Sequence, residues 1–236
     1  MESNAFTRTQ MLLGEEAMAR LSKARVAVFG IGGVGGHVVE ALARSGVGAL
    51  DLIDSDTISI SNLNRQIIAL HSTIGKYKVD VAKERVLDIN PAIQVAAYKT
   101  FYLPETAEQF DFSKYDYIVD AIDTVSGKIQ LVMQARQAGV PIICSMGTGN
   151  KIHPELFEIS DISKTSVCPL AKVMRQELRK RGVNHLKVVY SKELPIKVEA
   201  DPGVSKPVPG SNAFTPAVAG LLIAGEVIRD LVGNQA

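Results

Sequence analysis

Four glycines near the amino terminus could bring the peptide backbone close to a phosphate group. They are Gly30, Gly32, Gly33 and Gly35, and they follow an apolar run, Val26 to Phe29, that fits a buried strand. Because glycine has no side chain, a ligand can approach such a turn closely. The free amides and the dipole of a helix that begins there favour a bound anion. A tight strand-to-helix turn without a ligand gives the same pattern, so the glycines alone do not establish nucleotide binding.

Acidic residues follow the next apolar run. Leu50 to Ile53 is predicted to be the second strand, and Asp54 and Asp56 come directly after it. An acid at this place holds a ribose hydroxyl in NAD-binding and ATP-binding proteins alike, so Asp54 predicts a nucleotide without choosing the cofactor. Capping of a loop is the alternative for Asp54, and a structural role in the turn is an equal alternative for Asp56.

A polar cluster after the second strand separates the two cofactors. The segment Ser61 to Gln66 reads SNLNRQ, with Asn62 and Arg65 inside it, and Lys78 follows. An NAD-dependent oxidoreductase has little need of this array, whereas cationic side chains suit a triphosphate. The cluster therefore favours ATP. A surface charge is the alternative for Arg65, and Lys76 competes with Lys78 because both lysines lie near the start of one predicted helix.

These motifs as a set resemble a known superfamily. The glycine turn, SNLNRQ and the segment DAIDT occur in the order and spacing of the ubiquitin-activating enzymes and of the adenylyltransferases of molybdopterin and thiamine biosynthesis. The match runs from about Gly14 to Thr124. Enzymes of this superfamily activate a carboxylate by adenylating it, and the resemblance implies the same use of ATP by this chain.

The resemblance also implies roles for single residues. Gly33 is expected under the phosphates, Asp54 at the ribose, and Asp123 at a Mg²⁺ ion, for which a carboxylate oxygen is a suitable hard ligand. Arg65, Lys78 and Asp123 are the expected catalytic residues. The full set expected at the nucleotide comprises Gly30, Gly32, Gly33, Asp54, Asp56, Asn62, Arg65, Gln66, Lys78, Asp123 and Arg8.

Over nearly its whole length the chain looks most like the tRNA threonylcarbamoyladenosine dehydratases. The resemblance is carried by the segments FTRTQMLLGEEAM, GIGGVGG, NRQI, DAIDT and SVCPLAKVMRQELRKRG. It implies an AMP-forming ligase that uses ATP and Mg²⁺ to activate the carboxylate of a threonylcarbamoyl group on the adenosine beside the tRNA anticodon, after which an internal nucleophile closes a ring. It also implies a homodimer, with sulfur-transfer proteins as further candidate partners. Arg8 is expected to reach the phosphates of the neighbouring subunit, and a solvated arm is the alternative for it.

Three other functions stay open at this point. An adenylyltransferase for a ubiquitin-like sulfur carrier would share the ATP site, but Cys144 and Cys168 are two short of the four cysteines of a tetrathiolate zinc site. An NAD-dependent oxidoreductase would use the same glycine turn and leave SNLNRQ unexplained. A binding module without catalytic activity is the third. Simple packing is favoured over a covalent role for Cys168, and Cys144 is expected in the core.

The positions of these residues depend on a run of alternating elements. Strands are predicted at 26–29, 50–53, 93–98, 115–121 and 141–145, and helices at about 12–21, 34–45, 76–88 and 125–137. The alternation predicts an α/β fold with a Rossmann-like, mostly parallel sheet flanked by helices. Because ligands bind at the carboxyl ends of the strands in such a sheet, Gly33, Asp54 and Asp123 should converge.

Beyond Gly147 the pattern changes. We interpret the chain as a single domain, 1–236, with a nucleotide-binding core at about 24–147 and a C-terminal substrate or dimer extension at about 148–236. The extension is predicted to contain strands at 154–159 and 186–190, helices at 169–181 and 213–232, and a Pro/Gly-rich loop at 201–210.

The helix predicted at 169–181 is basic. Residues 161–200 contain nine Lys or Arg and four Asp or Glu, and the cations on this helix are Lys172, Arg175, Arg179, Lys180 and Arg181. In the tRNA interpretation they could hold phosphates. A solvated charged face is an equal alternative.

Composition adds little beyond the broad class. Of the 236 residues, 46% are hydrophobic and 22% charged, which is typical of a globular domain, and the formal net charge of +1 indicates no particular partner. No apolar stretch reaches the length of a membrane span, and the start, MESNAFTRTQ, lacks the apolar core of a signal peptide. We therefore expect a cytoplasmic protein.

Overall fold

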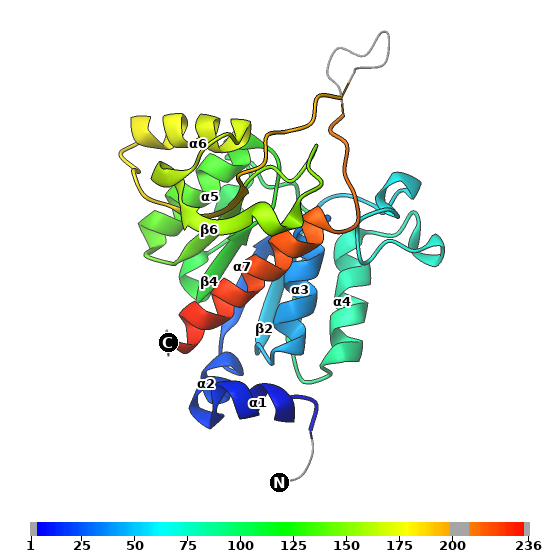
Figure 1. The fold of residues 1–236 in the computed structure, drawn as a ribbon. Coiled ribbons are helices and arrows are strands. Elements are labelled where there is room, and N and C mark those ends of the chain that lie inside the picture. Colours follow the sequence, from blue (N-terminus) through cyan, green and yellow to red (C-terminus); the bar gives the residue numbers. More distant parts are fainter. Residues whose placement is uncertain (1–3, 199–207, 234–236) are drawn as a thin grey trace.

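A seven-stranded sheet forms the centre of the protein in a computed structural model, which describes residues 4–198 and 208–233. The strand order is β3-β2-β1-β4-β5-β7-β6, and only β6 runs antiparallel to its neighbour. Helices flank the sheet, so the predicted α/β class is confirmed (Figure 1). The strands are β1 (Arg25–Phe29), β2 (Ala49–Ile53), β3 (Gln94–Tyr98), β4 (Tyr117–Asp120), β5 (Ile142–Ser145), β6 (Phe157–Asp161) and β7 (Lys187–Ser191).

The helices cover both faces of the sheet. Helices α3, α4 and α7 lie side by side on one face (Figure 1), where Val26 and Val28 of β1 belong to their hydrophobic cluster. The alternate residues Ala27 and Phe29 point to the other face and pack against α5. The helices are α1 (Thr7–Leu13), α2 (Glu15–Leu21), α3 (Gly35–Arg44), α4 (Lys78–Ile89), α5 (Val125–Ala138), α6 (Pro169–Lys180) and α7 (Thr215–Val232).

The strand register places the functional residues at one edge. Phe29, the last residue of β1, pairs with Ile53 of β2 on one side and with Asp120 of β4 on the other. The three strands therefore end level with one another, and the residues that follow them emerge together. This register turns three segments distant in sequence into neighbours.

Most element boundaries lie within two residues of the prediction, and three differences have a clear physical reason or are larger. The helix predicted at 12–21 is two helices, because Gly14 adopts φ +84° and ψ 166° and separates α1 from α2. Helix α4 begins at Lys78 rather than residue 76, because Tyr77 is extended and bridges to Thr57. The strand predicted from residue 154 begins at Phe157, after a single 3₁₀ turn.

The C-terminal part continues the same sheet. Strand β7 pairs in parallel with β5, and α7 returns across the sheet to pack against α3. The close approach requires Gly220, since a Cβ there would lie 2.5 Å from the carbonyl oxygen of Val34. Most of the loop predicted at 201–210 lies outside the described residues, and residues 208–210 have no regular structure. Within the described part of the chain, no helix is both long and apolar enough to cross a membrane.

Candidate nucleotide-binding site

The glycine turn between β1 and α3 leaves no space for a side chain at two of its glycines, Gly30 and Gly35. Gly30 has φ +89°, and a Cβ on it would lie 2.7 Å from the carbonyl oxygen of Ala121. A Cβ on Gly35 would collide with the carbonyl oxygen of Gly30. The turn leads directly into the ten-residue helix α3. The amides of Gly36 and His37 donate to the carbonyl oxygens of Gly32 and Val34, whereas those of Gly33 and Gly35 have no acceptor among the described residues. Backbone amides and the helix dipole therefore form an anion site at this end of α3.

Asp54 ties the end of β2 to the glycine turn. Its Oδ2 accepts a hydrogen bond from the amide of Ile31 at 2.7 Å, and its Oδ1 accepts one from the amide of Asp56 at 2.8 Å. Burial raises the pKa of the Asp54 carboxyl above its ordinary value, and the charge of Lys78 opposes this rise. Two amides use only part of the acceptor capacity of a carboxylate, so Asp54 can still accept a ribose hydroxyl.

Lys78 is buried in the pocket and already paired. Its Nζ lies 2.6 Å from Asp56 Oδ2 and 3.9 Å from Asp54 Oδ2, with 7% of the side chain exposed. Lys76, the competing lysine of the sequence analysis, is exposed and does not line the pocket. An anion at the pocket would share the Lys78 ammonium with the two carboxylates.

The SNLNRQ segment contributes amide and guanidinium groups. The Oδ1 atom of Asn62 accepts a hydrogen bond from the Ser59 amide at 3.0 Å, which fixes the side chain and leaves its NH₂ group available. Arg65 donates to the carbonyl oxygen of Ser61 at 2.8 Å and keeps further N–H groups for a ligand. Gln66 is 7% exposed, and its Oε1 has no hydrogen-bond partner among the described residues. An amide oxygen accepts hydrogen bonds, so a water molecule or a ligand hydroxyl would satisfy it.

Asp123 presents an exposed carboxylate from the loop after β4. Among residues 4–198 and 208–233, no three His, Cys, Asp or Glu side chains form a ready-made metal cage. Mg²⁺ binds to proteins through one or two carboxylates and completes its octahedral shell with phosphates and water. The donor set therefore fits a Mg²⁺ ion that arrives with a nucleotide and is held by Asp123.

These residues line one pocket of about 360 Å³, which is within the size range of small-molecule sites. Of the residues expected at the nucleotide, the structure brings together all but Arg8: Gly30, Gly32, Gly33, Asp54, Asp56, Asn62, Arg65, Gln66, Lys78 and Asp123.

Comparison with known proteins gives the family. The sequence model of the ThiF family matches residues 6–236. This chain belongs to the ThiF family. It is 46% identical to the tRNA threonylcarbamoyladenosine dehydratase of Bacillus subtilis (strain 168), in an alignment that covers 96% of this chain and 94% of that protein. The Escherichia coli tRNA N6-threonylcarbamoyladenosine dehydratase TcdA, solved in complex with ATP, has a TM-score of 0.88 at 33% identity, covering 96% of this chain and 93% of TcdA. Its complex with AMP gives the same TM-score at 32% identity, covering 98% and 96%.

Arg8 lies far from the pocket in this chain. It is exposed on α1, which packs with α2, and Arg20 of α2 donates to the carbonyl oxygen of Val232 at the end of α7. Pro216, near the start of α7, lines the pocket. Because an 18-residue helix is about 27 Å long, Arg8 and the pocket are at opposite ends of the molecule (Figure 1).

Several residues that line this pocket were not predicted from the sequence. Phe101 follows β3 and is 50% exposed, and Thr148 follows β5. Ser211 precedes α7, and Asn64 of SNLNRQ donates to its carbonyl oxygen at 3.0 Å. For Phe101 and Thr148 a usable signal exists, since both come within a few residues of a predicted strand end at the ligand-binding edge. Ser211 carries no such signal because it reaches the pocket only through the packing of α7.

Neither cysteine lines the pocket. Cys144 in β5 is fully buried, and burial raises the pKa of its thiol well above the ordinary value. Cys168 immediately precedes α6, is 4% exposed and belongs to the hydrophobic cluster beneath that helix. In this structure both thiols are therefore placed as core side chains.

Proposed function

We propose that this protein is an ATP-dependent tRNA threonylcarbamoyladenosine dehydratase that acts in the cytoplasm. It adenylates the carboxylate of the threonylcarbamoyl group on the adenosine beside the anticodon and releases AMP as the group closes into a ring. The observation that carries the proposal is a single pocket combining a phosphate-binding turn, a ribose acid, two cations and a free carboxylate. The likeness to TcdA and to the Bacillus subtilis dehydratase supports it.

The order of these groups along the pocket supports one orientation of ATP. The amides at Gly33 and the start of α3 hold phosphate oxygens, and Asp54 accepts from the ribose. Arg65 and Lys78 neutralise the charge that spreads over the triphosphate as the bond to the leaving group lengthens. Asn62 and Gln66 donate from their amide groups. Asp123 would hold a Mg²⁺ ion, which would supply positive charge to the phosphates.

The chemistry has two steps. A carboxylate oxygen of the substrate attacks the α-phosphorus, a new phosphorus–oxygen bond forms, and the bond to the bridging oxygen breaks, so that pyrophosphate leaves. An internal nucleophile of the substrate then attacks the activated carbonyl carbon, loses its proton, and displaces AMP. The oxygen removed from the carboxylate leaves with AMP, and the substrate has lost the elements of one water.

Ring closure requires no enzyme nucleophile. The attacking atom and the acyl carbon belong to one molecule, and such reactions have high effective concentrations. This agrees with the burial of Cys144 and Cys168 away from the pocket. A thioester on the enzyme is therefore not part of the proposal.

We propose a homodimer in which Arg8 serves the pocket of the other subunit. Arg8 lies at the end of the molecule opposite its own pocket, so it can contact phosphates only in a second copy. Helix α1 also exposes Met11 (75%) and Leu12 (86%) beside Arg8, and both are large apolar side chains that a partner would cover.

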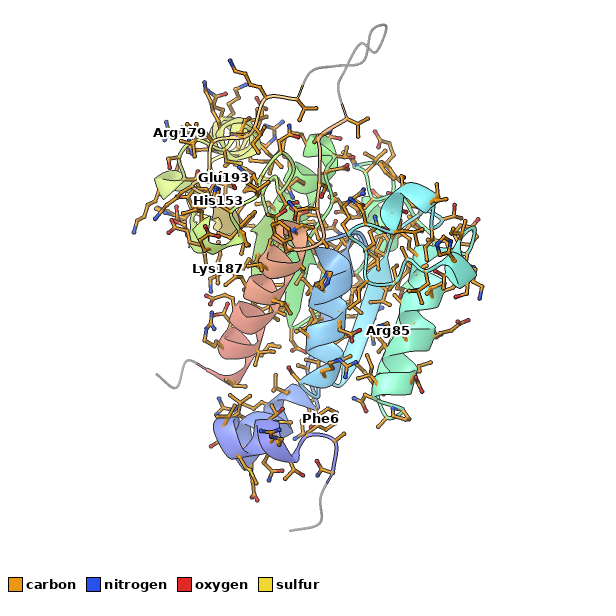
Figure 2. All side chains as sticks on the ribbon, turned by 45° about the vertical axis from the view of Figure 1, so that its right-hand side comes forward. Phe6, Arg85, His153, Arg179, Lys187 and Glu193 are labelled. Atoms are coloured by element: carbon orange, nitrogen blue, oxygen red, sulfur yellow. The ribbon has the colours of Figure 1, made fainter. Side chains whose placement is uncertain are left out.

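Helix α6 supplies the surface for the tRNA backbone. A shallow hollow on it is lined only by Lys172, Arg175, Gln176, Arg179 and Lys180. Within α6 the single carboxylate Glu177 pairs with Lys180 at 2.5 Å and with Arg181 at 2.9 Å. Lys172 and Arg179 form no ion pair with a described residue, and Figure 2 shows Arg179 on the outer side of the helix. The net charge of the helix suits phosphate contacts.

The test is mass spectrometry of tRNA bearing threonylcarbamoyladenosine after incubation with the enzyme, ATP and Mg²⁺. We expect the modified nucleoside to lose one water, with one AMP released per product. A parallel reaction offers a ubiquitin-like protein ending in Gly-Gly and measures pyrophosphate exchange. Unchanged tRNA together with exchange driven by that protein would replace the proposal with a sulfur-carrier adenylyltransferase.

A further inference from the structure

A buried lysine and aspartate lie directly behind the loop that carries Asp123. The Nζ atom of Lys128 is 2.9 Å from Oδ2 of Asp120, and both side chains are 0% exposed. Asp120 is the last residue of β4 and Lys128 lies in the first turn of α5. Neither residue lines the pocket, so the pair does not contact the nucleotide.

The Lys128–Asp120 pair forms hydrogen bonds with both backbone groups of Ile122, the residue immediately before Asp123. Lys128 Nζ donates to the carbonyl oxygen of Ile122 at 3.0 Å and to that of Ser145 at 2.7 Å. The contact with Asp120 Oδ2 is an ion pair without hydrogen-bond geometry, so the directed hydrogen bonds of the ammonium are the two to these backbone carbonyl oxygens. Oδ1 of Asp120 in turn accepts from the amide of Ile122 at 3.3 Å. The N–H and C=O groups of Ile122 are thus both fixed by one ion pair.

The same loop is pressed against the glycine turn. The amide of Ala121 donates to the carbonyl oxygen of Phe29 at 2.8 Å, and a Cβ on Gly30 would lie 2.7 Å from Ala121 O. On the other side, a Cβ on Gly127 would lie 2.8 Å from Cδ1 of Ile122. The loop therefore has no space to shift between the phosphate turn and α5, and the ion pair sets where Asp123 stands relative to that turn.

Stability alone does not account for a charged pair in this place. Removing two charges from water costs free energy that their attraction often only balances, and an apolar pair of similar volume is commonly as stable or more stable. What an apolar pair cannot supply is the set of directed hydrogen bonds to Ile122 and Ser145. The pair is better explained by the geometry it imposes.

We propose that Lys128, together with Asp120, is a positioning residue that aims the Asp123 carboxylate at the Mg²⁺–ATP complex. This inference rests on the proposed function, because it assumes that Asp123 serves the metal. The pair acts through the backbone of Ile122 and takes no part in the chemical steps.

The experiment compares ATP affinity with and without Mg²⁺ by calorimetry. The variant is Asp120→Asn with Lys128→Met, which removes both charges together and leaves neither one buried alone. We expect the ratio of the two affinities to fall by about tenfold or more, as when an outer residue of a metal site is lost. Asp123→Ala should lower the ratio equally, and adding it to the double change should lower it no further. The amides of Ile122 and Asp123 should also exchange hydrogen faster.

Lys187→Met is the matched control, because it removes a lysine paired with Glu226 and Asp230, and none of the three lines the pocket. Its affinity ratio should equal that of the wild type. If the double variant does not fold, Lys128→Arg replaces it in the experiment. The guanidinium group of arginine is larger than the ammonium group of lysine, so it must displace the hydrogen bond to the carbonyl oxygen of Ile122. A wild-type ratio in the folded variant overturns the inference, as does a fall that adds to that of Asp123→Ala.

The outcome for the wild-type protein separates this inference from the proposed function. No ATP binding in the presence of Mg²⁺, with no change in modified tRNA, rejects the function itself. ATP-dependent loss of water from tRNA with equal ATP affinities in the presence and absence of Mg²⁺ leaves the function standing and overturns the positioning role.

Discussion

Phe101 is the aromatic side chain best placed to meet a nucleobase. It lines the pocket with half of its surface exposed, and it follows β3, the neighbour of the strand that ends before Asp54. With the ribose at Asp54 and the phosphates at the glycine turn, the adenine extends toward the end of β3. A base stacked on an aromatic ring gains about 1–3 kcal/mol.

We therefore expect Phe101→Ala to weaken ATP binding by about tenfold, measured by calorimetry. Turnover at saturating ATP should change little, because the substitution leaves the phosphate contacts in place. Phe101→Tyr preserves the stacking surface and serves as the control. Equal affinities for the alanine and wild-type proteins would show that the base binds elsewhere.

Cys168 provides a second test at the scale of one residue. Because Cys168 is buried outside the pocket, Cys168→Ala should retain most of the wild-type kcat. It should lose about 1 kcal/mol of stability from the small cavity left beneath α6. Thermal unfolding and AMP release measure the two effects, and Cys144→Ala is the matched substitution. Complete loss of activity in a protein that still folds would restore a thioester step.

Residues that belong to a recognisable motif were predictable, and residues brought to the site by packing alone were not. The glycine turn, Asp54 and Arg65 belong to one continuous segment whose spacing carries the chemistry. Ser211 reaches the same pocket from more than a hundred residues away, through α7. Lys128 was missed for another reason: in sequence it is one more polar residue on a helix, and only the structure shows that it is completely buried.

At the scale of elements, strand ends were predicted better than helix starts. The apolar runs predicted the first and last residues of β1 and β2 to within one residue. The register between the two strands follows from their parallel pairing. The start of α4 was misplaced because the bridge between Thr57 and Tyr77 holds the chain extended for one more residue, an interaction that local propensity does not contain.

The attachment of α7 to the sheet rests on a small charge cluster. Lys187 of β7 contacts Glu226 at 2.7 Å and Asp230 at 2.6 Å, and Figure 2 shows Lys187 beside the α7 ribbon. Burial tends to raise the pKa of Glu226, but hydrogen bonds from Lys187 and Arg229 outweigh it and lower the pKa below its ordinary value of 4.5. Burial tends to lower the pKa of Lys187, and its two carboxylate partners raise it overall above 10.5.

These directions define a pH window for the cluster. A lowered carboxylate pKa contributes stability above the ordinary value of 4.5, and the contribution disappears as the pH falls through the lower folded value. Glu226→Gln should therefore reduce the free energy of unfolding at pH 7 by about 1 kcal/mol, a value discounted for partial exposure. The difference from wild type should shrink at an acidic pH well below 4.5. Urea unfolding at both pH values measures it, and a constant difference would contradict the assignment.

At the scale of the whole molecule, the basic face of α6 and the nucleotide pocket are connected through one continuous sheet. Strand β7, which leads away from α6, pairs with β5 and so with the strands whose ends form the pocket. We expect a substrate with a long phosphate backbone to place its modified nucleoside in the pocket and its stem along α6. The sequence predicted the charges on this helix, but not which of them are neutralised by Glu177.

Lys172→Ala together with Arg179→Ala should weaken tRNA binding without affecting ATP affinity. If each side chain neutralises one phosphate, losing both makes the dependence of log Kd on log salt shallower by about 1.4 to 1.8. Fluorescence anisotropy of labelled tRNA between about 50 and 200 mM salt measures this slope. Lys23→Ala is the control, because Lys23 is an exposed lysine between α2 and β1, at the edge of the sheet opposite the pocket. An unchanged slope in the double variant, or an equal change in the control, would mean that the tRNA backbone does not lie on α6.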